Sequence, residues 1–178
     1  MLVPALACLV DYPLPPLSPH LRRADIVVQW HWDAQAQAVV GTIAFGPQTV
    51  GLPDYVHGGL ATAICDEAMG WACWMSGHVA PGAMTQSQFE QPLRAGSSAT
   101  LRASIDKVDG RKLHTQATLH TQATLHTQAT LHTQATLHTE RGVAVRASGL
   151  YISIIPADWR PFAHWPASER FAQLRPSE

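Results

Sequence analysis

The sequence has little charge of either sign and few cysteines. Its 178 residues include 12 Lys and Arg against 13 Asp and Glu, which gives a formal net charge of -1. Because proteins that hold nucleic acid usually carry a basic excess, we expect no nucleic-acid partner. The three cysteines, Cys8, Cys65 and Cys73, match the spacing of neither a zinc site nor a secreted disulfide framework. This usage favours a reducing, cytoplasmic location and gives no reason to expect a metal.

Long apolar runs are also missing. No stretch approaches the ~20 consecutive apolar residues of a membrane-spanning helix, so we expect no membrane partner. The N-terminal segment lacks a basic region and is interrupted by Pro4 and Pro13, which argues against a signal peptide. A hydrophobic content of 46% is enough for one domain with a core. We divide the chain into a Pro-rich leader at 1–23, one domain at 24–155 and a C-terminal tail at 156–178.

The clearest local pattern is a long apolar helix. Residues 57–77, HGGLATAICDEAMGWACWMSG, are rich in Ala and apolar on nearly every face. A helix that is apolar all round has to be buried. Alternating apolar and polar side chains, bounded by turn residues, predict strands around it. These strands are expected at 24–32, 38–45, 99–108 and 143–154.

Two glycines indicate how the strands are shaped. Asp109 and Gly110 form a strong hairpin-turn signal after the third strand. In the last strand the apolar phase shifts near Gly149, which predicts a bulge there. One long buried helix, preceded by a hairpin and followed by long antiparallel strands, calls for a sheet wrapped around that helix. The predicted fold class is therefore α+β, in the architecture called a hotdog.

Asp66 and Glu67 interrupt the apolar helix. An ionised carboxylate buried without partners costs several kcal/mol, so the pair has either a structural contact or a chemical use. The helix begins at His57-Gly58-Gly59, where unpaired N–H groups and the positive end of the helix dipole converge. Such a place can hold a developing oxyanion.

At these residues the sequence resembles the hotdog acyl-CoA thioesterases, in particular the phenylacetate-degradation type. The matching text is VHGGLATAICDEAMGWA, followed by QFEQPLRAG, the Asp-Gly turn and VAVRASGLYI. The likeness covers roughly residues 38–154 apart from the repeat described below. An acidic residue nine positions after the His of HGG is a specific feature, whereas the strand matches are generic.

The resemblance implies hydrolysis of an acyl-CoA thioester. Asp66 would be the catalytic carboxylate, acting as general base on water or as nucleophile on the thioester carbon. Gly58 would offer its backbone N–H to the thioester carbonyl, with Gly59 beside it in substrate binding. His57 would orient this loop or hydrogen-bond near the carbonyl oxygen. Glu67 is not required by the pattern and is expected to have a structural role.

Many relatives also place a Thr or Ser on the strand after the helix, where it positions water near the carboxylate. Here the corresponding position falls on Gly82, so the sequence departs from the pattern. Thr85 or Ser87 would serve only if the start of the strand is shortened, and we retain Thr85 as the candidate. Arg94 and Arg146 are candidates to meet the CoA phosphates as charge-assisted partners, unless they are simply solvated.

The resemblance further implies a homodimer or homotetramer in which each active site is built from both subunits. CoA is part of the substrate, so no separate cofactor is expected. Two other classes stay open. One is a non-catalytic hotdog binding or scaffold protein whose repeat mediates self-association. The other is a hydratase on the same fold, which needs a catalytic His near the acid in a different arrangement.

A tandem repeat occupies residues 113–139, where LHTQAT occurs four times and a fifth copy begins. Its alternation predicts a strand, and because six is even, whole copies never turn a side chain to the wrong face. Removing three copies, 18 of the 178 residues, leaves 160, the size of a single hotdog domain. We interpret the repeat as an in-frame expansion of a strand, with function set elsewhere.

The whole repeat is too long for one strand of this sheet, since 27 residues reach about 90 Å at ~3.3 Å per residue. Surplus copies must leave the sheet as a loop, as a protruding strand paired with another chain, or as a local fold. The repeat has no Gly, Pro or Asn, which argues against a neat internal hairpin. Its His side chains would lie ~20 Å apart on a strand, too far apart to share a metal ion.

Overall fold

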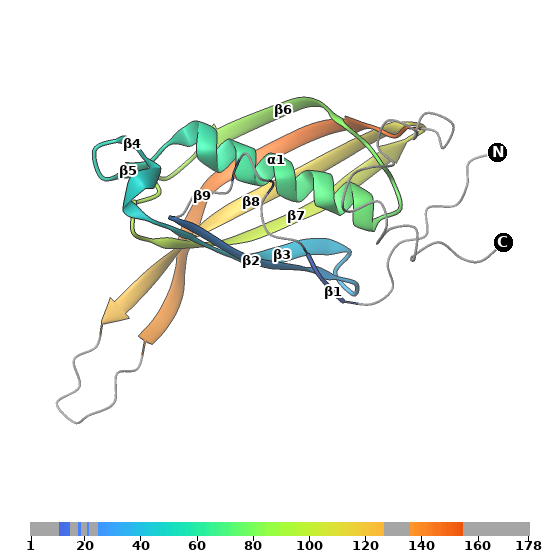
Figure 1. Ribbon diagram of the computed structural model, residues 1–178. Coiled ribbons are helices and arrows are strands. Elements are labelled where there is room, and N and C mark those ends of the chain that lie inside the picture. Colours follow the sequence, from blue (N-terminus) through green and yellow to red (C-terminus); the bar gives the residue numbers. More distant parts are fainter. Residues whose placement is uncertain (1–10, 15–17, 19–20, 22–24, 127–135, 155–178) are drawn as a thin grey trace.

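A computed structural model describes residues 11–14, 18, 21, 25–126 and 136–154 of the chain. One antiparallel sheet of seven strands and one long helix form the body of the molecule (Figure 1). The strand order in the sheet is β1-β2-β3-β7-β8-β9-β6. The elements are β1 (Tyr12–Pro13), β2 (Ile26–Asp33), β3 (Ala38–Phe45), β4 (Val50–Leu52), β5 (Tyr55–Val56), α1 (Gly58–Met75), β6 (Gly82–Phe89), β7 (Ser98–Asp109), β8 (Lys112–His126) and β9 (Thr136–Ile152).

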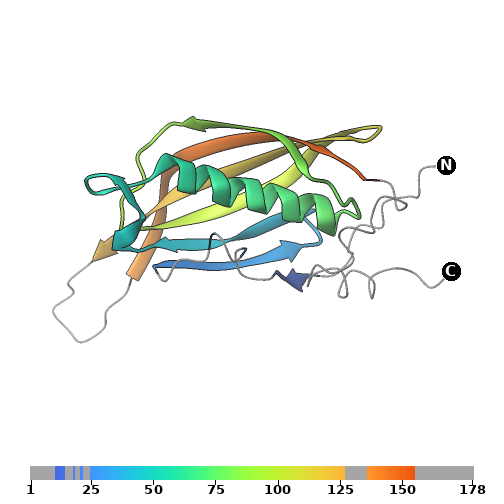
Figure 2. The same ribbon diagram turned by 45° about the horizontal axis from the view of Figure 1, so that its top comes forward.

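The helix α1 lies across one face of the curved sheet (Figure 2). It begins after His57, whose Nδ1 accepts a hydrogen bond of 3.0 Å from the Gly59 N–H. It ends at Met75, and Gly77 beyond it has a φ of 85°, a left-handed conformation that suits glycine. The predicted helix and the α+β hotdog fold are confirmed. Within the described residues, no helix is long and apolar enough to cross a membrane.

The core lies between α1 and the concave face of the sheet. Large side chains there are fully buried, and each contributes about 1.5–3 kcal/mol relative to an exposed one. They come from β2, β3, α1 and β8, which ties the helix to the sheet along its length. The largest are Trp32, Phe45, Ile43, Ile64, Met69, Met75, Leu113 and Leu119.

The bulge predicted at Gly149 is wrong. The β8–β9 register stays regular past Gly149 and shifts instead at Ala144, which the ladder skips. A Cβ on Gly149 would lie 2.7 Å from both Thr115 Oγ1 and the Tyr151 ring. The glycine is therefore explained by close packing against the Tyr151 ring. The apolar phase changes near Gly149 because Leu150 and Ile152 are partly exposed apolar residues on the other face of a regular strand.

The repeat continues β8 and β9 beyond the rest of the sheet as a two-stranded ribbon (Figure 1). Pairing of β8 with β7 ends at Thr121, but pairing with β9 continues to His126 opposite Thr136. The prediction against an internal hairpin is therefore wrong in part, because repeat copies pair with each other. Residues 127–135, which lie between the two strands, are outside the described residues. The C-terminal tail also lies outside the described residues.

Candidate active site

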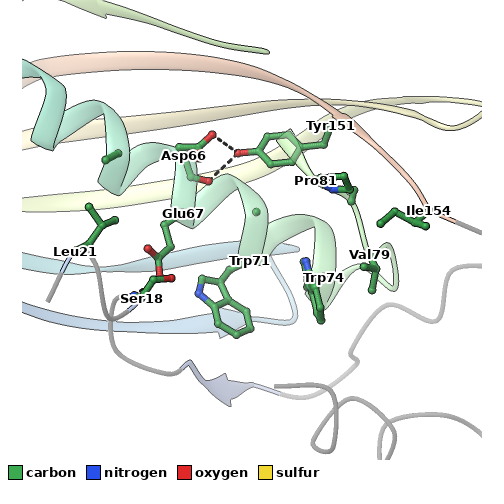
Figure 3. Close-up of a pocket in the computed structure, with 13 residues that line it drawn as sticks. Ser18, Leu21, Asp66, Glu67, Trp71, Trp74, Val79, Pro81, Tyr151 and Ile154 are labelled. Atoms are coloured by element: carbon green, nitrogen blue, oxygen red, sulfur yellow. Dashed lines mark hydrogen bonds between the residues drawn. The ribbon is translucent and has the colours of Figure 1, made fainter. Parts of the chain in front are cut away.

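The Asp66 carboxylate is held by two hydroxyl groups. Its Oδ1 accepts a hydrogen bond of 2.6 Å from Thr85 Oγ1 and one of 2.7 Å from the Tyr151 hydroxyl. The Tyr151 hydroxyl also lies 2.8 Å from the backbone oxygen of Asp66 (Figure 3). None of the described side chains donates to the other carboxylate oxygen, Oδ2. Charge-assisted bonds of this kind fix the orientation of the carboxylate and leave one oxygen for chemistry.

An irregularity in β6 brings Thr85 to the acid. The register with β9 shifts between Gly82 and Met84, so Ala83 is an extra residue in β6. Side chains normally alternate between the faces of a strand, but the extra residue puts positions 82 and 85 on the same face. A Cβ on Gly82 would lie 3.7 Å from Asp66 Oδ1, so the position expected from the resemblance does face the acid. Thr85 supplies the hydroxyl that glycine lacks.

Ser87, the other hydroxyl considered on this strand, has a different environment. Its Oγ is buried and has no hydrogen-bond partner among the described residues. Of the two candidates, only Thr85 contacts Asp66.

Tyr151 was not singled out by the sequence analysis. It lies on β9 opposite Leu113 of β8 and Gly82 of β6, and its side chain is buried. Burial, and then its hydrogen bond to the Asp66 carboxylate, raise the pKa of Tyr151 well above its usual range. The phenol is therefore a permanent proton donor to the carboxylate.

Gly149 makes room for the Tyr151 ring, because a Cβ there would collide with it. A Cβ on Gly82 or Gly70 would only touch the ring, at 3.5 Å or 3.9 Å. The signal for Tyr151 in the sequence was an inward-facing series in the last strand, which the phase shift expected near Gly149 interrupted before it reached Tyr151. That series runs through residues 145, 147, 149 and 151.

The start of α1 forms a second group of candidate residues. His57 Nδ1 accepts from the Gly59 N–H, so a neutral His57 ring carries its proton on Nε2, for which the described part of the chain shows no acceptor. Gly58 is the first helical residue, and its N–H has no acceptor within the helix. A Cβ on Gly58 would lie 3.1 Å from the Phe89 ring. The Gly59 N–H is therefore used in capping the helix, whereas the Gly58 N–H and the His57 Nε2–H are the donors that a bound ligand could use.

The two arginines lie apart from Asp66. Arg94 is exposed, packs its guanidinium 5.5 Å from the ring centre of Tyr55, and pairs with Tyr55 through its backbone. It therefore belongs to the region around the start of α1. Arg146 is 54% exposed and pairs with Glu90 at 2.6 Å.

Within one chain the structure does not bring the helix start and the acid together. Gly58 and Asp66 are eight residues apart on α1, which corresponds to about 12 Å along the axis. Groups that act on one thioester carbonyl each have to lie ~3 Å from the reacting atoms. A single chain thus holds the acid and the amide donors at two separate places.

A cavity of about 340 Å³ opens beside Asp66 (Figure 3). The side chains around it are mostly apolar, apart from the two carboxylates and two hydroxyls. Its lining residues are Ser18, Leu21, Ala63, Asp66, Glu67, Gly70, Trp71, Trp74, Val79, Ala80, Pro81, Tyr151 and Ile154. Polar groups converging on an apolar pocket of this size are typical of a small-molecule site.

Glu67 points away from the Asp66 cluster. Its Oε1 accepts hydrogen bonds from the Ser18 backbone N–H at 2.6 Å and from Ser18 Oγ at 2.8 Å. Figure 3 shows Asp66 directed toward Tyr151 and Glu67 directed toward Ser18. Glu67 thus makes a structural contact with Ser18.

Comparison with known proteins agrees with this fold. Residues 54–126 match the family model of the Thioesterase superfamily. Among solved structures, a thioesterase superfamily protein superposes with a TM-score of 0.57 and 24% identity over 71% of this chain. The match covers 53% of that protein, so this chain spans about half its length.

Two other solved structures have similar folds. The PaaI protein of the phenylacetic acid degradation operon of E. coli gives a TM-score of 0.54 at 18% identity, over 73% of this chain and 80% of that one. A Streptococcus mutans protein bound to acetyl CoA gives 0.54 at 12% identity, over 66% and 82%. At these identities the likeness establishes a hotdog-like thioesterase fold.

Proposed function

We propose that this protein hydrolyses acyl-CoA thioesters to a free acid and CoA, with Asp66 as general base or nucleophile. The observation that carries the proposal is the Asp66 carboxylate, held through Oδ1 by Thr85 and Tyr151 at the side of an apolar cavity. Two comparisons support it. The Thioesterase superfamily match includes Asp66 and Thr85, and one solved structure with this fold is described as bound to acetyl CoA.

In the general-base route, Asp66 Oδ2 takes a proton from a water molecule as the water oxygen attacks the thioester carbon. The Thr85 hydroxyl donates its hydrogen bond to Oδ1, so the lone pairs of its oxygen are available to accept a hydrogen bond from that water. The tetrahedral intermediate then collapses, the C–S bond breaks, and the CoA sulfur takes the proton. In the nucleophilic route the Asp66 carboxylate attacks the thioester carbon, the C–S bond breaks and CoA leaves as its thiolate. Water then hydrolyses the resulting anhydride, which releases the free acid, regenerates the Asp66 carboxylate and supplies the proton for the CoA sulfur.

The oxyanion of the intermediate needs donors, and Gly58 N–H and His57 Nε2–H are the candidates. Because they lie about 12 Å from Asp66 along the same helix, we propose that a second copy of the chain supplies them. The site would then be shared within a homodimer or homotetramer. β6, the outermost strand next to Asp66, exposes Met84 (55%) and Phe89 (56%), and is the edge along which a second copy can extend the sheet.

The phosphates of CoA would meet Arg94 near the start of the helix and Arg146 on β9. No cofactor beyond the CoA of the substrate is part of the proposal. Cys65 and Cys73 are free and buried, which suits the reducing cytoplasm that we propose as the location.

A non-catalytic scaffold is the second candidate. The observation that favours it is the β8–β9 ribbon, whose strands beyond Thr121 and Gly142 pair only with each other within the described residues. Open strand edges of this kind can pair between molecules.

Release of CoA thiol from a panel of acyl-CoAs tests the proposal. Turnover by the intact chain supports the hydrolase, and a folded chain without turnover on any acyl group supports the scaffold. Loss of the C=C absorbance of an enoyl-CoA in the same panel would instead indicate a hydratase.

A further inference from the structure

Ser18 and Leu21, two described residues that precede β2, form one side of the cavity beside Asp66. They line it together with residues of α1, β9 and the turn after the helix. Before them in the chain, β1 pairs with β2, and the Leu14 N–H donates to the Trp30 oxygen at 3.4 Å. A second attachment is the pair of hydrogen bonds from Ser18 to Glu67.

The attachment of Ser18 to Glu67 consists of two short hydrogen bonds to a charged group. Both donors of Ser18 converge on one oxygen of a partly buried carboxylate, at 2.6 and 2.8 Å. Bonds to a charged acceptor are roughly twice as strong as neutral ones. Glu67 follows Asp66 directly, so this attachment also holds Ser18 beside the cavity that Asp66 lines (Figure 3).

The other sides of the cavity belong to the helix and to strands that the core holds in place. Trp71 and Trp74 on α1 pack edge to face, with ring centres 6.4 Å apart. Tyr151 is held by Asp66. Among the described residues that line the cavity, only Ser18 and Leu21 precede the helix.

We propose that Glu67 is a positioning residue that fixes Ser18, and with it Leu21, as a wall of the acyl pocket, so that this wall sets the size of the acyl group reaching Asp66. This inference rests on the proposed function. The cavity volume of about 340 Å³ is near the lower end for small-molecule pockets, roughly 300–1,000 Å³. The indoles, Leu21 and Ile154 make it apolar. The substrate class is therefore a compact, uncharged acyl group, with longer acyl chains excluded by the wall.

Binding of non-hydrolysable acyl-CoA thioethers of increasing chain length tests this directly by calorimetry. The wild type is expected to lose affinity once the acyl group exceeds the pocket. Glu67→Ala should raise affinity for the long analogues by about tenfold relative to the short ones, the scale of discrimination by a hydrophobic pocket. Ser18→Ala should have a smaller effect, because the Ser18 backbone N–H still reaches Glu67. Glu67→Gln keeps an acceptor oxygen and should restore much of the wild-type ratio.

Two matched controls and one second readout complete the test. Ser148→Ala and Asp106→Asn change exposed residues of β9 and β7 away from the pocket and should leave the ratio unchanged. Hydrogen exchange at the Ser18 amide should become faster in Glu67→Ala, which a purely catalytic role for Glu67 would not produce.

The inference is overturned if Glu67→Ala leaves both the affinity ratio and the Ser18 exchange rate unchanged. It is also overturned if Ser18 is released without a change in the ratio, or if no thioether binds at all. If the affinity ratios change as expected but the protein hydrolyses no acyl-CoA, the result counts against the proposed function and leaves the role of Glu67 standing.

Discussion

Thr85 on β6 donates a hydrogen bond of 2.6 Å to Asp66 on α1, across 19 residues of sequence. The contact depends on the extra residue Ala83 in β6. Because of it, Thr85 and Gly82 both face the helix, although they are three positions apart on the strand. A sequence that lacks a hydroxyl at the usual position therefore still places one on the acid. Because Thr85 and Asp66 lie on different elements, the effect of each side chain can be measured by replacing it alone.

Replacing Thr85 with Val keeps the shape of the side chain and removes the hydroxyl. Since Thr85 holds Oδ1 and has lone pairs for the attacking water, kcat/KM should fall by about 10²-fold, the lower end of the range for positioned proton-transfer groups. Thr85→Ser should retain most of the activity. Thiol release from the best acyl-CoA measures both, and a Val variant as active as the wild type would remove Thr85 from the site.

Tyr151→Phe removes the second donor to Asp66. We expect kcat to fall about tenfold with little change in KM, because the hydroxyl orients the carboxylate rather than the substrate. Steady-state kinetics on the same acyl-CoA measures this. An unchanged kcat, or a rise in KM alone, would show that Thr85 is sufficient to hold the acid.

The same residue predicts a pH dependence of stability. Burial and the Asp66 carboxylate raise the pKa of Tyr151 in the folded state above the ~10 of an unfolded chain. Its contribution to the free energy of unfolding is therefore complete below pH ~10 and is lost as pH rises above that value. Thermal unfolding from pH 8 to 11 should show a smaller alkaline loss for Tyr151→Phe than for the wild type. Parallel curves would contradict the raised pKa.

Gly58 permits a clean test of the amide donor. Gly58→Pro removes the N–H at the first helical position, where proline is tolerated, and His57 before it is already extended. Gly58→Ala is the control, since it brings a similar Cβ contact with Phe89 but keeps the N–H. The Pro variant should have a kcat about 10²-fold below the Ala variant, as for other oxyanion donors.

Mixing Gly58→Pro with Asp66→Asn tests whether the site is shared between two copies. If one copy supplies the acid and the other the amide, hybrid dimers contain one intact site and activity returns on mixing. Activity that stays at the level of the separate variants, while subunits demonstrably exchange, would mean that each site uses one chain.

The repeat can be shortened at a point defined by pairing. Thr121 lies opposite Gly142, so deleting residues 122–139 removes three whole copies and joins the pair through Glu140 and Arg141. Gly142 already has a φ of 131°, and a positive-φ glycine suits the end of a short hairpin loop. The shortened protein should keep its fold by circular dichroism and a comparable kcat/KM. A folded but inactive product would show that the ribbon contributes to function.

The sequence was sufficient for those features that depend on local pattern. The buried helix could be predicted because apolar residues fill all its faces, and Asp66 is recognisable because it breaks that pattern nine residues after His57. The strand positions followed from alternation. Thr85 could be named only as one of two candidates, since no local signal reveals that Ala83 is an extra residue.

The rest depends on pairing between distant segments. Tyr151 meets Asp66 across 85 residues, and Ser18 meets Glu67 across 49. Neither contact leaves a pattern in the sequence near either residue. The β8–β9 ribbon was not predicted because the sequence interpretation considered only a tight turn within the repeat. In the structure nine residues, 127–135, lie between the two strands.

The central claim is that the Asp66 carboxylate hydrolyses a thioester, and Asp66→Asn tests it most directly. The amide has the same shape and can still accept from Thr85 and Tyr151, so the fold should be retained, but it can neither take a proton from water nor attack the thioester carbon. We predict that the wild type releases CoA from at least one acyl-CoA and that kcat/KM of Asp66→Asn falls by 10²-fold or more, roughly the effect of losing a general base. Equal thiol release by a folded Asp66→Asn protein would contradict the account.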